Sequence, residues 1–352
     1  MKVLILGASY GSLLSTKLLM AGHDVTLVCR ENTASLINNE GTRVRIKLRD
    51  ESEHRIIDSG SLPGKVTAAT PENTNPADYD MVALAMQEPQ YSSPQVKALM
   101  ARIAAAKVPC ISIMNMPPRP YLARIPSLQN ADLDSCYDDA ALWQAFEPGL
   151  ISLCSPDPQA FRPPEEKANF LHVGLPTNFK AAMFEHEEHN VILRQLETDI
   201  AEVQLDGKDV PVKLRVYDSL FVPMAKWSML LTGNYRCVTP EGVRPIRDAV
   251  HSNIEESASM YAWVDAIAQK LGAAADDLVP FEKYAKAAEN LLKPSSVARS
   301  IDGGSSSIER VDMLVQLVGN ELGLRSDAVD SVVSVVNQRI AANKAPECET
   351  VS

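Results

Sequence analysis

The chain has 352 residues and a net charge of −11 at pH 7, from 34 basic and 45 acidic residues. Its length favours two domains over one core. Its acidity argues against a nucleic-acid surface or a polybasic membrane anchor, although a local pocket of basic side chains can still bind anions.

Nothing in the sequence predicts export, membrane insertion or a metal site. No apolar stretch is long enough to span a bilayer, and no secretory signal precedes the first expected strand. The six cysteines form no C-x-x-C pair, which is typical of a reduced chain, so a cytoplasmic location is expected. His186 and His189 lack the H-E-x-x-H order and an obvious third ligand, and a polar loop or helix start is expected there.

The first thirty residues predict a βαβ unit. Lys2–Leu6 has the pattern of a buried strand, Gly7–Ser12 of a turn, Leu13–Ala21 of an amphipathic helix that stops at Gly22, and Asp24–Cys29 of a second strand. Glycines in such a turn let the backbone approach a pyrophosphate, whose charge the positive end of the helix stabilises. The order of elements predicts a dinucleotide-binding domain.

The glycine turn departs from the usual G-x-G-x-x-G pattern. It reads Gly7-x-x-x-Gly11, with Ser9 in the middle glycine position and one residue missing. The expected cofactor contacts in this turn are Gly7, Ser9, Tyr10, Gly11 and Ser12.

Arg30 follows the second strand, where it bears on the choice of dinucleotide. An acidic residue there accepts hydrogen bonds from the ribose of NAD, whereas an arginine pairs with the 2′-phosphate of NADP. The sequence therefore predicts NADP(H) as cofactor. Two alternatives remain: a solvated surface arginine, or a relaxed preference in which Glu31 contacts the ribose.

Strands and helices alternate as far as residue 115, which predicts a parallel sheet with helices on both faces and hence an α/β fold of Rossmann type. The expected elements are an accessory hairpin of Arg43–Leu48 with His54–Ile57, strands Val66–Thr70, Met81–Met86 and Cys110–Met114, and a helix Pro94–Ala106.

The middle of the chain is rich in Pro, Asp, Ser and Gln between Pro117 and Pro164, which predicts a loop-rich insertion. Phe170–Val173 and Val212–Val216 follow as expected strands, with a helix Val191–Val203 between them. Beyond Asp218 helical periodicity dominates. The expected helices are Leu220–Thr232, Arg247–Leu271, Phe281–Leu292, Ser307–Leu322 and Ala328–Ala342, before a frayed tail Lys344–Ser352.

This organisation predicts an NADP-binding domain over residues 1–217 and an all-α domain for substrate binding and dimerisation over residues 218–352. The cleft between two such domains is the default site.

Lys226 is the only charged residue from Ser219 to Tyr235. A lysine on a largely apolar helix either extends its ammonium to water or lies in a cleft with a lowered pKa, able to donate a proton. The local sequence by itself favours the first alternative.

The chain resembles the ketopantoate reductase (2-dehydropantoate 2-reductase) family as a divergent member. The resemblance covers most of the chain in order, and is loose between about Pro117 and Lys213. The matching pieces are Lys2–Gly7, Gly22–Arg30, Ile111–Asn115, Lys226, Lys293–Asp302 and Ile308–Asp312.

The resemblance assigns roles to several residues. Lys226 matches the general acid, Asn115 the asparagine beside the nicotinamide, and Ser296 a hydroxyl that contacts the substrate carboxylate. Glu309 matches the active-site acid with a spacing off by one, so Ser307 or Asp312 are alternatives. Asn234 matches a further substrate-binding residue. Each also has a structural alternative: a strand end for Asn115, an N-cap for Ser296, a C-cap for Asn234 and a solvated face for Glu309.

Three departures from the family pattern affect the expected site. Asn115-Met-Pro-Pro118 replaces the family's Asn-Gly-x-Gly, Met86 stands where many members carry a second basic residue near the cofactor phosphate, and Leu230 replaces an asparagine that grips ketopantoate. The resemblance implies an NADPH-dependent reductase of a small 2-oxo acid or related carbonyl. The alternatives are an imine reductase or opine-type dehydrogenase, and a non-catalytic NADP-binding regulator. The expected partners are a small-molecule substrate and, as an open alternative, a second copy of the chain.

Overall fold

The computed structural model describes residues 1–344. The chain divides into two compact units: Met1–Arg124 with Ala141–Pro223, and Ile125–Ala140 with the chain from Met224 onward. The second unit thus takes up part of the stretch expected as an insertion of the first. Of the expected tail, residues 345–352 lie outside the described residues, and Cys348 with them.

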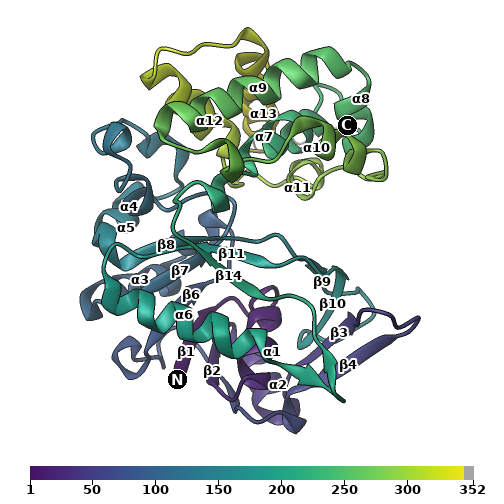
Figure 1. Ribbon diagram of the computed structural model, residues 1–352. Helices are drawn as coiled ribbons and strands as arrows, with labels where there is room; N and C mark the ends of the chain where they lie inside the picture. The colour runs from purple at the N-terminus through teal and green to yellow at the C-terminus, as the bar shows by residue number, and fades with distance from the viewer. Residues whose placement is uncertain (345–352) are drawn as a thin grey trace, which may run out of the picture. The chain divides into compact units, whose positions relative to one another are not determined.

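An eight-stranded sheet forms the centre of the first unit, in the order β14-β11-β8-β7-β6-β1-β2-β5 (Figure 1). Six neighbouring strands run parallel: β5, β2, β1, β6, β7 and β8. Strand β11 is antiparallel to β8, and β14 is parallel to β11. The α/β class is therefore confirmed. The strands are β1 Lys2–Leu6, β2 Asp24–Val28, β5 Val66–Ala69, β6 Met81–Leu84, β7 Cys110–Ile113, β8 Ile151–Ser155, β11 Phe179–Ala182 and β14 Leu214–Tyr217.

Helices cover both faces of this sheet. The connection from β1 to β2 crosses the sheet in one direction, and the connection from β6 to β7 crosses it in the other. Because such connections are right-handed, their helices α1 and α3 lie on opposite faces. Helix α6 packs against α1. Because both faces are covered, the two middle strands β1 and β6 are apolar in every residue after Lys2. The helices are α1 Gly11–Met20, α2 Glu31–Glu40, α3 Pro94–Ala106, α4 Arg119–Leu122, α5 Ala140–Gln144 and α6 Glu187–Ala201.

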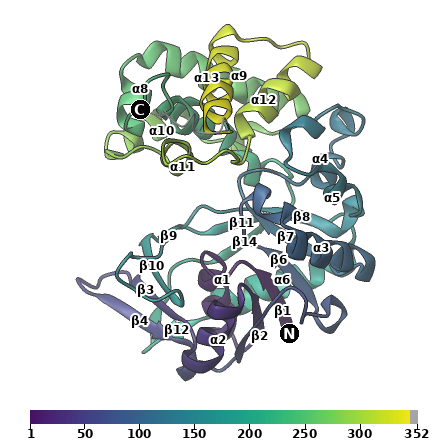
Figure 2. The ribbon, with the colours of Figure 1, turned by 180° about the vertical axis from the view of Figure 1, so that it is seen from behind.

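A second sheet has the order β4-β3-β10-β9 and lies to one side of the main sheet, next to α1 (Figure 1, Figure 2). The expected hairpin is confirmed, because β3 and β4 pair antiparallel. The strand expected at Phe170–Val173 belongs to this sheet, where it pairs with β3. The strands are β3 Arg43–Lys47, β4 His54–Asp58, β9 Gln159–Phe161 and β10 Phe170–Leu175; Gln204–Leu205 (β12) and Lys208–Asp209 (β13) form a separate short hairpin.

The expectation of a loop-rich stretch over Pro117–Pro164 is wrong at β8. This strand pairs with β7 and is buried along its whole length, although it contains two serines. Ser112 on β7 donates to the carbonyl of Ser152 at 3.0 Å, and Ser152 donates to the carbonyl of Ala182. Backbone carbonyls of adjacent strands thus satisfy the hydroxyls of Ser112 and Ser152, and Ser155 donates to the Asp157 carboxylate, which lets polar residues occupy a central strand.

The second unit is helical in its described part, and two expected helices are interrupted. The segment expected at Leu220–Thr232 is α7 Trp227–Met229 followed by a π-helical segment, Leu230–Asn234. The helix expected at Arg247–Leu271 restarts where Asn253 accepts a hydrogen bond from the Glu256 amide at 3.1 Å. The other helices are α8 Ile246–His251, α9 Ile254–Leu271, α10 Phe281–Ala288, α11 Ser296–Asp302, α12 Val311–Glu321 and α13 Asp327–Lys344, and α12 packs against both α9 and α13 (Figure 2).

Over residues 1–344, no helix combines the length and apolar character needed to cross a membrane, and no group of three or more His, Cys, Asp or Glu side chains is placed to hold a metal ion. His186 precedes the first residue of α6 and His189 lies in its first turn, so this pair is a helix start. The described cysteines, Cys29, Cys110, Cys136, Cys154 and Cys237, are free thiols.

Candidate functional site

The chain reverses its direction across the main sheet between β1 and β6. From β1 it continues to β2 on one side, and from β6 to β7 on the other. Such a point leaves a crevice at the carboxyl ends of the strands, where ligands of doubly wound folds bind. Gly7, Arg30, Met86 and Asn115 follow β1, β2, β6 and β7 within two residues. The fold therefore brings four of the expected cofactor residues to one edge of the sheet.

Both glycines of the turn are required by their surroundings. Gly7 has φ +103°, and a Cβ there would lie 2.6 Å from the Met86 Cγ and 2.7 Å from the Ala85 carbonyl oxygen. A Cβ on Gly11 would lie 2.7 Å from the Ile5 Cγ2. A side chain at Gly7 would thus collide with the segment that follows β6, and one at Gly11 would push α1 away from β1.

No side chain caps the N-terminus of α1, where Tyr10 is the N-cap residue. The Tyr10 hydroxyl donates instead to the Pro158 carbonyl at 2.7 Å, and its ring meets the edge of Phe179 with centroids 6.1 Å apart. Burial raises the pKa of Tyr10. Ser12 donates its hydroxyl to the Ala8 carbonyl. With both side chains engaged, this turn offers a ligand mainly the positive end of its helix.

Arg30 is exposed at the carboxyl end of β2 and is the N-cap residue of α2. Within residues 1–344 its guanidinium has no hydrogen bond or ion pair. Glu31, the alternative ribose contact, is exposed as the first residue of α2. On the other side of Gly7, the Met86 amide donates to the Tyr91 hydroxyl at 3.0 Å, so a bonded backbone and an apolar side chain adjoin the turn.

The loop after Asn115 is buried. Met116 is fully buried, Pro117 and Pro118 are buried beside it, and Pro118 precedes the first residue of α4. Tyr121 on α4 donates to the Leu220 carbonyl at 2.6 Å, which fixes the short helix. Where the family pattern has glycines, this chain therefore has a packed and stiff connection.

Lys226 is half-buried at the N-terminus of α7 in the second unit. Its carbonyl accepts the Leu230 amide at 2.8 Å, and the next two residues, Trp227 and Ser228, are buried. The π-helical segment then begins at Leu230, a buried residue. π-helical turns are rare and occur often at functional sites.

Ser295, not Ser296, is the residue that organises the start of α11. Its hydroxyl oxygen accepts a hydrogen bond from the Ala298 amide at 3.1 Å, and its O–H donates to the Asn234 carbonyl at 2.7 Å. Ser295 is buried and Ser296, the first residue of the helix, is exposed. The alternative of Ser296 as N-cap is therefore wrong by one residue, and Asn234 ends the π-helical segment instead of capping an α-helix.

The three candidates for the acidic position differ in their environments. Asp312 is fully buried, and Arg310 donates to both its oxygens at 3.0 Å. Ser307 is exposed and donates to Asp138 at 3.0 Å. Glu309 is buried, with 6% of its surface exposed, and its carbonyl accepts the Tyr235 hydroxyl. The solvated-face alternative for Glu309 is thus wrong, and Asp312 is committed to an internal ion pair.

The second unit brings together three of its four expected site positions. Asn234 bonds Ser295, the neighbour of Ser296, and the next residue, Tyr235, bonds Glu309. Burial raises the pKa of Tyr235, and Asp312 and Glu309 add to this effect. Lys226 lies eight residues before Asn234, at the other end of the same segment. Sequence reasoning missed Ser295 and Tyr235; a serine before Ser296 is a visible N-cap signal, whereas the partner of Tyr235 lies 74 residues away.

No protein-family model matches this chain, and no curated protein is similar to it in sequence. Its fold, however, is that of the ketopantoate reductases. A putative ketopantoate reductase from Ralstonia solanacearum superposes with a TM-score of 0.69 at 15% identity, over 97% of this chain and 98% of that one. The 2-dehydropantoate 2-reductase of Methylococcus capsulatus also gives 0.69, at 12% identity over 99% of both chains. A D-mandelate dehydrogenase with NADH and anilino(oxo)acetate gives 0.64, at 12% identity over 98% and 100%. The resemblance drawn from the sequence is confirmed for the fold.

Proposed function

We propose that this protein is a nicotinamide-dependent reductase of 2-oxo acids, with NADPH as the preferred cofactor. The proposal rests on the position of four residues, Gly7, Arg30, Met86 and Asn115. They lie at the carboxyl edge of the main sheet, on either side of the point between β1 and β6 where the strand order reverses. This is the position at which doubly wound folds bind dinucleotides.

The residues at this edge fit a dinucleotide. Gly7 lets the turn pack against the Ala85 and Met86 segment, and the N-terminus of α1 has no side-chain cap, so its amides suit a pyrophosphate. Arg30 supports the choice of NADPH, because an exposed guanidinium without a protein partner in the described chain is suited to a 2′-phosphate. The D-mandelate dehydrogenase neighbour was solved with NADH, so the preference rests on Arg30 alone.

When bound, the nicotinamide supplies the hydride that reduces the substrate carbonyl. In this proposal, which follows the family resemblance, Lys226 donates a proton to the carbonyl oxygen as negative charge develops on it, and its ammonium stabilises that charge. Ser296 binds the substrate carboxylate together with Asn234, whose segment Ser295 holds. Glu309 is the acid of the site, since Asp312 is paired with Arg310.

The substrate pocket is proposed to favour apolar or bulky 2-oxo acids over ketopantoate. Leu230 and the buried Met116–Pro118 connection remove polar partners that a hydroxylated substrate needs. An unpaired hydroxyl in a dry site costs about 1–3 kcal/mol. The neighbour with bound anilino(oxo)acetate, an oxalic acid anilide that carries an aryl group beside its carbonyl and carboxylate, supports this direction. A homodimer is proposed by analogy with the dimeric ketopantoate reductase of Staphylococcus aureus.

The test is NADPH oxidation by the purified protein against a panel of 2-oxo acids, with and without added amines. Turnover on the acids alone supports the proposal. Turnover only with amines indicates an imine reductase or opine-type dehydrogenase, and NADPH binding without turnover on any member indicates a regulator. Either of the last two outcomes overturns it.

A further inference from the structure

Two basic side chains lie side by side at the edge of the main sheet. Lys180 on β11 and Arg215 on β14 are register partners on neighbouring parallel strands, so both side chains point to the same face. The alternate residues of these strands pack into the core on the other face: Phe179, Ala181, Leu214 and Val216. Like charges placed opposite each other across strands repel, so this face of the sheet concentrates positive charge.

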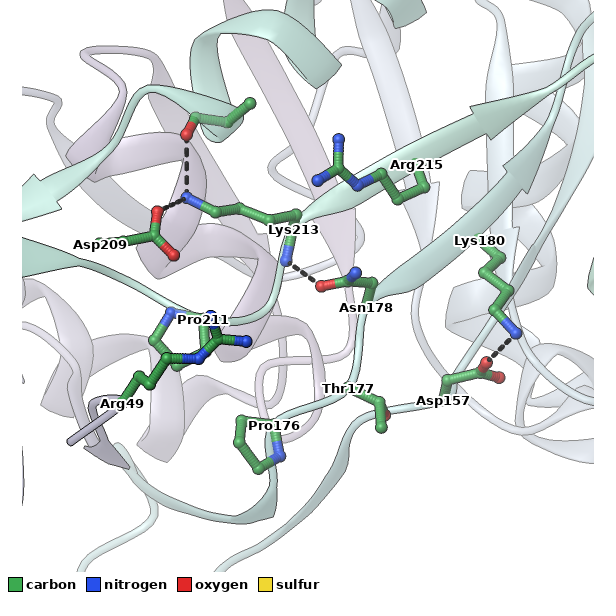
Figure 3. A pocket seen from close by; sticks show the side chains of 11 residues that line it. Arg49, Asp157, Pro176, Thr177, Asn178, Lys180, Asp209, Pro211, Lys213 and Arg215 are labelled. Atoms are coloured by element: carbon green, nitrogen blue, oxygen red, sulfur yellow. Dashed lines mark hydrogen bonds and ion pairs between the residues drawn. The ribbon is translucent and has the colours of Figure 1, made fainter. Parts of the chain in front are cut away.

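These two side chains line a pocket of about 650 Å³ that lies wholly within the first unit (Figure 3). The pocket contains four basic side chains and two acidic ones, an excess of two positive charges in a protein of net charge −11. None of the residues expected to bind the cofactor lines it. The charged lining residues are Arg49, Lys180, Lys213, Arg215, Asp157 and Asp209.

Each lysine of the pocket already has an acidic partner. Lys180 pairs with Asp157 at 3.1 Å, and Lys213 pairs with Asp209 at 2.7 Å (Figure 3). Lys213 is also buried and donates to the Ala201 carbonyl at 2.9 Å. The two acidic residues are therefore used by the lysines, and neither balances an arginine.

The two arginines account for the excess charge. Over residues 1–344, the guanidinium groups of Arg49 and Arg215 make no hydrogen bond or ion pair with the protein. They come from separate parts of the chain, Arg49 from the loop after β3 and Arg215 from β14, and both line the same pocket. Two unpaired guanidiniums in one concavity offer the planar, multiple donors that phosphate and carboxylate groups accept.

One wall of the pocket is held in a strained conformation. Val212, which is β-branched and fully buried, has φ +67°. The next residue, Lys213, donates its amide to the Asn178 side chain at 2.9 Å, which fixes the turn against the β10–β11 connection. Behind the wall, the Lys17 ammonium donates to the Val210 and Pro211 carbonyls at 3.1 and 3.2 Å. Strained backbone held in place by its surroundings is typical of binding sites.

We propose that this pocket binds a small organic anion with at least two negative charges, a phosphate monoester or a di- or tricarboxylate, between Arg49 and Arg215. The pocket volume lies in the range of small-molecule sites, and exceeds the need of an inorganic ion. The acidic surface repels anions elsewhere, so binding is confined to this local excess of positive charge. The site is separate from the proposed nicotinamide site, and its occupant need not be a substrate.

The experiment is calorimetric titration of the full chain with four probes: inorganic phosphate, glucose 6-phosphate, succinate and citrate. Ionic strength is held constant with NaCl, because exposed charges are screened. We expect at least one probe to bind with a dissociation constant of about 1 mM or below. The phosphate and carboxylate probes distinguish the two ligand chemistries. Failure of all four to bind overturns the proposal.

The paired variants R49Q and R215Q, combined in one chain, should weaken that binding about tenfold or more. R162Q is the matched control, because Arg162 is exposed in the same unit and does not line the pocket. It should bind the probe as the wild type does. Equal affinity in the double variant and the wild type overturns the proposal. Binding that does not depend on these arginines is a general salt effect.

Saturation with NADPH separates this pocket from the cofactor site. The probe should bind equally well with NADPH present, and R30A should not change its affinity. Competition between the probe and NADPH would place the anion in the nucleotide site and overturn the assignment to Arg49 and Arg215. These readouts need no turnover, so they stand independently of the proposed reaction.

Discussion

The Tyr284 hydroxyl occupies the position that a side chain at residue 233 would need. A Cβ built on Gly233 would lie 1.8 Å from that oxygen, which donates to the Met229 carbonyl at 3.1 Å. Met229 is the last residue of α7, at the junction with the π-helical segment. The glycine thus lets α10 hold, through one hydroxyl, the short helix that begins after Lys226.

Gly233→Ala should destabilise the protein because the added methyl group displaces Tyr284. Overpacking of this kind costs about 1–3 kcal/mol. Urea unfolding measures the change. Tyr284→Phe removes the clashing oxygen, so Gly233→Ala should cost less in that background than in the wild type. Equal costs in both backgrounds would show that the hydroxyl does not restrict residue 233.

Arg30→Ala should abolish the preference for NADPH over NADH. The charge-assisted pair with a 2′-phosphate is worth roughly tenfold or more in affinity, and NADH cannot form it. Titration of both cofactors by intrinsic fluorescence measures the preference. Arg162→Ala, another exposed arginine of the same unit, should leave it unchanged. A wild type that binds both cofactors equally would disprove the phosphate assignment.

Lys226→Ala should lower turnover by about a hundredfold or more while NADPH affinity stays nearly unchanged. The reason is that a proton donor acts in the chemical step and not in cofactor binding. Steady-state kinetics with the best 2-oxo acid, together with cofactor titration, test both parts. Lys286→Ala removes an exposed lysine of the same unit and serves as control. A Lys226→Ala enzyme that keeps most of its turnover would show that this lysine extends to solvent and is not the proton donor.

Ketopantoate should be a poorer substrate than alkyl or aryl 2-oxo acids. Leu230 and the buried connection after Asn115 leave its hydroxyl without partners, a difference of about 1–3 kcal/mol. The comparison is of kcat/KM across the series. A tenfold advantage for ketopantoate would mean that other groups compensate for these departures.

Lys17 should make stability depend on pH. Burial, reinforced by the nearby Lys213, lowers the pKa of Lys17 from 10.5 to about 7, although Asp209 opposes the shift. Between these two values the unfolded chain binds more protons at this residue than the folded protein does, so stability rises with pH. Relative to Lys17→Met, the free energy of unfolding of the wild type should rise by up to about 1.4 kcal/mol per pH unit in this window.

Urea unfolding of the wild type and Lys17→Met at several pH values between about 7.5 and 9.5 checks this slope. Other groups that titrate in this range are common to both proteins and cancel in the difference. A difference that is constant across the range would mean that Lys17 keeps an ordinary pKa in the folded state.

The local sequence was enough to predict the elements whose signals lie within a few residues. The strand, glycine turn and helix at the N-terminus need only apolar runs and the freedom of Gly7, and β1, α1 and β2 match them closely. The hairpin of β3 and β4 likewise follows from neighbouring segments. Arg30 could be placed at the end of β2 for the same reason, because strand ends are marked by local pattern.

The tertiary structure alone decided what depends on distant partners. Strand β8 lies between β7 and β11, where the Ser152 hydroxyl donates to a carbonyl of β11 and the Ser152 carbonyl accepts the Ser112 hydroxyl of β7, which its own composition does not reveal. The hydrogen bond from Ser295 to the Asn234 carbonyl joins residues 61 positions apart. Arg49 and Arg215 meet in one pocket only because two strands far apart in the chain bring them there. Propensity acts over a few residues, whereas hydrogen bonds and charge pairs across the fold determine which polar groups are satisfied and which remain available to a ligand.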